Sequence, residues 1–102
     1  MPLRIVPEAD DEAEVAFLSR STVAKALEFH RAHRAAIARI RSDPTSLPLH
    51  PEATGPGVRY AKLAGFPYVV LFRTAAPAET VVLAVLHTSA GPGQYRRAER
   101  RG

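Results

Sequence analysis

The sequence of 102 residues contains no cysteine, so it can form neither a disulfide framework nor a thiolate centre. This composition suits a reducing cytoplasm, which is where we expect the protein to be located. The longest apolar run is the six residues Val81–Leu86, far short of the roughly 20 that cross a bilayer. Residues 1–7 also lack the basic-then-apolar layout of a signal peptide. We therefore expect neither a membrane protein nor an exported one.

The motifs of the common catalytic classes are also missing. The sequence has no phosphate-binding loop, dinucleotide fingerprint, zinc signature or serine-nucleophile motif. His30 and His33 are three residues apart, but this spacing alone is a weak indication of a metal site. A histidine on an apolar helix face is usually a packing residue instead. We expect neither a metal nor another cofactor.

Acidic residues are scarce outside one short segment. Five of the ten Asp and Glu residues lie between Glu8 and Glu14, whereas residues 20–102 contain thirteen Lys and Arg but only five Asp and Glu. The net charge of +4 therefore understates how basic most of the chain is. A positive field favours nucleic acid or an acidic protein partner, whereas the simpler alternative is a solvated surface with no partner.

What the sequence does contain is the pattern of a small α+β domain. Two nearly continuous apolar runs, Tyr68–Phe72 and Val81–Leu86, are typical of strands covered on both faces. The short connections between apolar segments predict a three-stranded antiparallel meander with strands at about 58–63, 67–73 and 80–87. These strands should form the centre of the sheet.

One further strand and two helices are predicted before the meander. Residues 3–6 have the pattern of a short strand, and Pro7 suits the first turn of a helix. Ser21 is the expected N-cap of a second helix that continues to about residue 42. Because the turn between them is short, the two helices should form an antiparallel hairpin packed on one face of the sheet.

Two segments carry no regular pattern. Asp43-Pro44 ends the second helix, and residues 44–57 form a loop with four prolines and two glycines. Residues 93–102 are a basic C-terminal tail that is too short to be stable as an independent helix. We expect this tail to be either frayed or docked on the sheet or on a partner.

Several short motifs follow one another along the chain in a definite order. They are Phe29, Asp43-Pro44, Val58-Arg59, Leu63, Phe66-Pro67-Tyr68, Ala84-Val85-x-His87, Pro92 and Tyr95-Arg96. Their order and spacing resemble the RelE/ParE superfamily of bacterial toxins, in its plasmid-stabilisation branch. The resemblance implies one toxin domain over residues 1–102, from a type II toxin–antitoxin pair. It also implies a hetero-oligomer with a cognate antitoxin that lays a helix or an added strand across the toxin.

One group in that superfamily cleaves messenger RNA in the ribosome without a metal. The ribose 2′-hydroxyl attacks the adjacent phosphate, which requires a general base, a general acid and cations. On this chain the resemblance assigns catalysis to Lys62 and Tyr95, with His87 as a substitute acid or base. Two arginines expected in this group are replaced by Val69 and Ser89. Whether the protein is an enzyme therefore stays open.

Another group inhibits DNA gyrase by binding to it, without chemistry of its own. Arg59, Arg73 and Arg96 are the target-binding residues that we expect for such a surface. The leading hypothesis is a toxin whose basic sheet surface meets a nucleic-acid-linked target, by gyrase-type inhibition or a translation block. The alternatives are a metal-independent, ribosome-dependent mRNA endoribonuclease and a degenerate, inactive relative that serves as an interaction module. In the simplest alternative, Arg59 and Lys62 are edge-strand charges that prevent sheet-to-sheet association.

Overall fold

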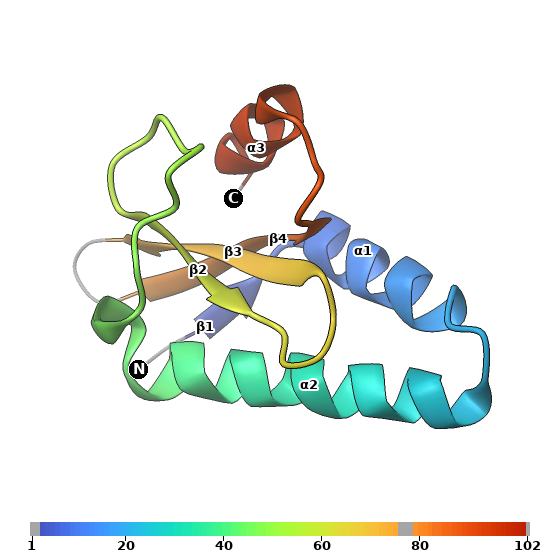
Figure 1. Ribbon diagram of the computed structural model, residues 1–102. Coiled ribbons are helices and arrows are strands. Elements are labelled where there is room, and N and C mark those ends of the chain that lie inside the picture. Colours follow the sequence, from blue (N-terminus) through green and yellow to red (C-terminus); the bar gives the residue numbers. More distant parts are fainter. Residues whose placement is uncertain (1–2, 76–78, 102) are drawn as a thin grey trace.

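The computed structural model describes residues 3–75 and 79–101, which form one sheet with helices on both faces (Figure 1). The described elements are β1 (Leu3–Ile5), α1 (Pro7–Leu18), α2 (Val23–Ser42), the 3₁₀ turn η1 (Pro44–Ser46), β2 (Val58–Lys62), β3 (Tyr68–Ala75), β4 (Glu79–His87) and α3 (Pro92–Glu99). The strand order is β1-β4-β3-β2. The pairs β2/β3 and β3/β4 are antiparallel, and β1 is parallel to β4. The α+β class, the N-terminal strand and the antiparallel meander are confirmed.

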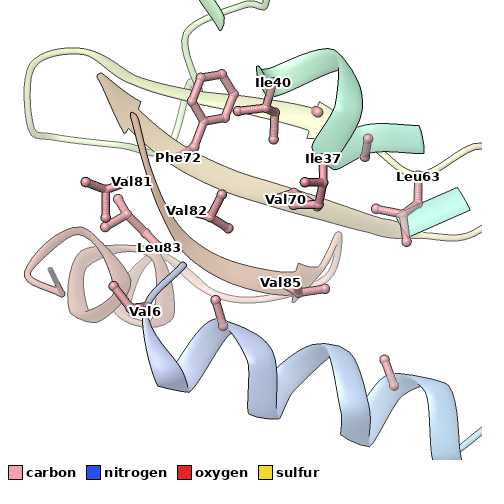
Figure 2. Packing of buried hydrophobic residues seen from close by; sticks show 14 of the residues in the cluster. Val6, Ile37, Ile40, Leu63, Val70, Phe72, Val81, Val82, Leu83 and Val85 are labelled. Atoms are coloured by element: carbon pink, nitrogen blue, oxygen red, sulfur yellow. The ribbon is translucent and has the colours of Figure 1, made fainter. Parts of the chain in front are cut away.

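The two central strands read as continuous apolar runs because both of their faces are covered. Val70 and Phe72 of β3 point into the larger core under the helical hairpin, where Ile37 and Ile40 of α2 meet them (Figure 2). The intervening side chain, Leu71, points to the opposite face and is fully buried there as well. Burying each large aliphatic or aromatic side chain contributes roughly 1.5–3 kcal/mol to stability.

Short-range interactions determine where each helix of the hairpin begins. Pro7 occupies the first turn of α1, followed by Glu8 and Asp10, whose charges suit a helix N-terminus. The N-cap of α2 is Thr22, whose hydroxyl accepts a hydrogen bond from the Lys25 N–H at 3.1 Å. The prediction of Ser21 was therefore wrong by one residue. Both side chains can cap a helix, but Thr22 has the extended backbone that the cap position requires.

The outer edge of β4 is completed by side chains rather than by a longer strand. β1 pairs with β4 only as far as Ile5, opposite Val82. Beyond that point the Val85 N–H donates to Glu12 Oε1 at 3.0 Å, and Arg101 Nη1 donates to the Leu83 carbonyl at 3.0 Å. Glu12 and Arg101 therefore supply the hydrogen bonds that another strand would make.

The basic C-terminal tail is docked, and most of it is the helix α3, on the face of the sheet opposite the hairpin (Figure 1). Tyr95 and Ala98 are buried there in a second core, which also contains Val69, Leu71, Ala84 and Leu86. The helix is held at its C-terminal end by Arg73, which donates to the Glu99 carbonyl at 2.9 Å and to the Arg101 carbonyl at 3.3 Å. Packing and capping thus stabilise a helix that is too short to persist alone.

Neither a membrane-spanning helix nor a metal-binding cluster is present among the described residues. No helix in the part of the chain that the structure describes combines the length and the apolar character needed to cross a membrane. Within residues 3–75 and 79–101, no three His, Asp or Glu side chains gather into a group that could hold a metal ion.

Candidate functional site

A pocket of about 380 Å³ opens on the α3 side of the sheet, between β2, α3 and the loop that precedes β2. Its lining residues are His50, Pro51, Glu52, Tyr60, Lys62, Val69, Thr88, Ala90, Pro92 and Tyr95. Side chains alternate along β2, and Lys62 pairs with Val69, so Tyr60 and Lys62 point to the face that α3 covers. The structure therefore brings together two of the three predicted catalytic residues, Lys62 and Tyr95.

His50 is positioned beside these two residues by backbone pairing in the loop. The His50 N–H donates to the Val58 carbonyl at 3.0 Å, and the Tyr60 N–H donates to the Pro48 carbonyl at 3.1 Å. The loop thus runs along the free edge of β2, with a bridge between Leu49 and Arg59. This pairing places the imidazole of His50 among the aromatic side chains of the pocket.

The imidazole ring lies between two tyrosines. Its centroid is 5.0 Å from that of Tyr60 in an edge-on contact, and 4.3 Å from that of Tyr95 with a tilt of 32°. The Glu52 N–H donates to His50 Nδ1 at 3.1 Å, so the proton of the neutral ring is on Nε2. Burial lowers the pKa of His50, against the opposing charges of Glu52 and Glu99. His50 is therefore neutral at pH 7 and can donate a hydrogen bond through Nε2.

Tyr95 is held in its protonated form. Burial raises the pKa of its hydroxyl, and the charge of Glu52 raises it further. The side chain is 3% exposed. In this setting the phenol can donate a proton or a hydrogen bond, but it is a poor general base at neutral pH.

His87, the third predicted catalytic residue, lies on the other side of the sheet. Its ring packs edge-on against Tyr68 at 5.2 Å, and Tyr68 in turn contacts Phe29 of α2 at 5.4 Å. His87 Nδ1 accepts a hydrogen bond from the Ser89 N–H at 3.0 Å. This residue therefore caps the end of β4 on the hairpin side, and it does not line the pocket of Lys62 and Tyr95.

Two of the three predicted target-binding arginines point inward. Arg59 Nη1 donates to the Leu47 carbonyl at 2.6 Å, and its Nε is buried without a hydrogen-bond partner among the described residues. Arg73 is partly buried and binds the carbonyls that end α3. Only Arg96, on α3, has an exposed side chain.

Most of the exposed positive charge lies on the helices instead of on the rim of the sheet. Exposed arginines on or beside these helices are Arg31, Arg34, Arg39 and Arg41 of α2, and Arg96, Arg97 and Arg100 at α3. Composition predicted a basic surface, but it could not show which guanidinium groups the fold would use internally.

The fold is shared with a chain in a solved structure described as the chromosomal ParDE TA system from P. aeruginosa. The TM-score is 0.69, and the match covers 85% of this chain and 95% of that one at 18% sequence identity. A comparison with protein-family models finds no match, and neither does a search of curated proteins. At this identity the likeness concerns the fold alone, and it confirms the ParE-like α+β fold that the ordered motifs implied.

Proposed function

We propose that this protein is the toxin component of a bacterial type II toxin–antitoxin system, active in the cytoplasm and neutralised by a cognate antitoxin. The observation that carries this proposal is the match in fold to a chain of the ParDE system over most of both chains. The ordered motifs from Phe29 to Arg96, which resemble the plasmid-stabilisation branch, support it independently.

We infer that the toxin acts by binding a nucleic-acid-linked target, such as DNA gyrase or the translating ribosome. The exposed arginines of α2 and α3 support this mode, because they create a positive field that attracts polyanions. The make-up of the pocket also supports it. The pocket residues include one lysine and no arginine, and they also include the acidic residue Glu52. A single cation is weak support for the extra negative charge of a phosphoryl transition state.

Metal-independent mRNA cleavage is the second candidate, supported by Lys62, Tyr95 and His50 lining one pocket. In this reaction the ribose 2′-oxygen attacks phosphorus and the bond to the 5′-oxygen breaks, leaving a 2′,3′-cyclic phosphate and a 5′-hydroxyl. Glu52 would accept the proton of the 2′-hydroxyl, and the Tyr95 hydroxyl would donate one to the leaving oxygen, while His50 Nε2 donates a hydrogen bond. Lys62 would stabilise the charge on the non-bridging oxygens.

Inducible expression in a bacterium, with and without the adjacent gene, tests the toxin proposal. We expect the chain alone to arrest growth and co-expression of the antitoxin to restore it. Accumulation of the folded chain at a high level without any growth defect would contradict an active toxin. A folded chain that binds the adjacent gene product yet leaves growth unaffected would instead indicate the inactive interaction module.

Two substitutions in the pocket separate the modes of action. For a ribonuclease, Lys62→Ala and Tyr95→Phe should slow cleavage of ribosome-bound message by orders of magnitude and relieve toxicity. For inhibition by binding, message stays intact, and induced DNA damage would indicate gyrase. Lys25→Ala is the matched control, because Lys25 is an exposed lysine on α2 that pairs with Glu28 and lies outside the pocket.

A further inference from the structure

The helical hairpin carries an exposed stripe of side chains on each of its helices. On α1 the stripe is formed by Glu8, Asp11, Val15 and Leu18, and on α2 by Val23, Leu27, Arg31 and Arg34. All eight are exposed, including the four aliphatic side chains, with exposed fractions of 64% for Val15, 70% for Leu18, 78% for Val23 and 47% for Leu27. Their spacing of three or four residues places each set along one side of its helix, away from the buried face.

The two stripes have the same layout with opposite charges. Both are apolar near the turn that joins the helices, and both are charged farther from it. Measured from Leu18, the residues Val15, Asp11 and Glu8 are three, seven and ten positions away. Measured from Val23, the residues Leu27, Arg31 and Arg34 are four, eight and eleven positions away. At a rise of about 1.5 Å per residue, the corresponding positions agree to within about one residue along the helix axis.

We propose that this face of the hairpin is a self-association surface, on which a second copy of the chain docks around a two-fold axis parallel to the helices. In this arrangement α1 of each copy lies on α2 of the other. Leu18 and Val15 then meet the partner's Val23 and Leu27, and Asp11 and Glu8 meet the partner's Arg31 and Arg34. The two-fold axis makes every contact twice, which is the property of an isologous interface.

The charges of the hairpin favour a second copy over another occupant. The ion pairs of the described residues are Arg4–Glu79, Lys25–Glu28 and Arg101–Glu12, so the charged members of both stripes have no ion-pair partner within the described chain. A nucleic acid or a uniformly acidic protein would be attracted by α2 but repelled by α1. A second copy of the hairpin presents its acidic stripe to the basic stripe of the first copy, and its basic stripe to the acidic one.

The end of the hairpin also has a shape that can receive an aliphatic side chain. A hollow of about 350 Å³ lies there, lined by Phe17, Leu18, Arg20, Ser21, Thr22, Val23, Ala26 and Leu27. Its exposed apolar side chains would be shielded from water when α1 of one copy lies on α2 of the other. This proposal does not depend on the target or on the toxic activity.

Sedimentation velocity of the isolated chain over a concentration series tests the proposal. We expect a reversible dimer. The acid-reversed variant Glu8→Lys/Asp11→Lys and the base-reversed variant Arg31→Glu/Arg34→Glu should each weaken the dimer by at least about tenfold, because the symmetric ion pairs become like-charge contacts. All four positions are exposed, and circular dichroism would verify that each variant is folded.

Mixing the two reversed variants in equal amounts gives the decisive result. In the mixed pair every contact between α1 and the partner's α2 is again between opposite charges, so a heterodimer should form. Arg97→Glu/Arg100→Glu at α3 is the matched control and should dimerise like the unmodified chain. A chain that stays monomeric up to about 100 µM, or a mixture that forms no heterodimer, overturns the proposal.

Discussion

Arg101 Nη1 lies 2.9 Å from Glu12 Oε1, which joins the segment after α3 to the first helix of the chain. The two side chains are 21% and 26% exposed, so solvent screens this ion pair less than it screens a surface pair. Both side chains also form hydrogen bonds with the backbone of β4: Glu12 accepts from the Val85 N–H, and Arg101 donates to the Leu83 carbonyl. The contact therefore links the hairpin side of the sheet to the C-terminal segment that follows α3.

Replacing Glu12 by alanine should reduce the free energy of unfolding by about 1–3 kcal/mol, because the Val85 N–H and the Arg101 guanidinium lose their acceptor. Glu12→Gln should have a smaller effect, since the amide oxygen can still accept from Val85. Urea unfolding measures both changes. Glu14→Ala, at an exposed position of the same helix, should change stability by no more than about 0.5 kcal/mol. Equal losses in the Glu12 and Glu14 variants would contradict this role.

Glu99 should make stability depend on pH in the acid range. Burial alone would raise the pKa of Glu99, but hydrogen bonds from Gly55 and Thr54 and the charge of Arg96 outweigh it and lower the pKa. A carboxyl with a lowered folded-state pKa stabilises the fold above its ordinary pKa of 4.5 and loses this contribution as the pH falls through the folded-state value. Unfolding experiments at a series of pH values should therefore show a smaller acid-induced loss in Glu99→Gln than in the unmodified protein. Glu14→Gln should retain the full loss.

His50 should titrate below its ordinary pKa of 6.5, because burial disfavours the charged ring. Proton–nitrogen NMR spectra would report both the midpoint and the tautomer, with the proton on Nε2, and His50→Gln identifies the signal. The charge of Glu52 opposes the effect of burial, so Glu52→Gln should lower the midpoint further. A midpoint at or above 6.5, or a proton on Nδ1, would exclude this geometry.

Arg96 and Arg59 should behave differently when the target is bound through phosphate groups. Arg96 is exposed, so Arg96→Ala should reduce the slope of log affinity against log salt by about 0.7 to 0.9 for the one phosphate contact that is lost. Arg59 donates to the Leu47 carbonyl, so Arg59→Ala should lower stability while leaving the slope unchanged. The opposite pattern would mean that the rim of the sheet, rather than α3, meets the target.

The central strands and the hairpin could be predicted because their signals are local. The runs Tyr68–Phe72 and Val81–Leu86 are apolar at every position, as expected for strands whose two faces are both buried. In the structure α1 and α2 cover one face of these strands, and α3 covers the other. The helix α3 gave no such signal. It contains no continuous apolar stripe, and it is stabilised by Arg73 and by Glu99 contacts to Thr54, all set by the tertiary fold.

The candidate site was predictable only in part for the same reason. Lys62 and Tyr95 could be chosen by resemblance, and the fold does place them in one pocket. His50 lies in a proline-rich loop without periodicity, and its contact with Tyr95 joins residues far apart in the sequence. The inward orientation of Arg59 and Arg73 could not be predicted either, because the sequence does not distinguish an arginine that binds a backbone carbonyl from one that binds a target.

The parallel pairing of β1 with β4 determines when this protein can fold during its synthesis. Leu3 is opposite Thr80, so closing the sheet brings together segments separated by most of the chain. Such a large loop closure slows folding, and it cannot begin on the ribosome until β4 has left the exit tunnel. Until β4 is available, β1 therefore has no strand to pair with, and the sheet cannot close.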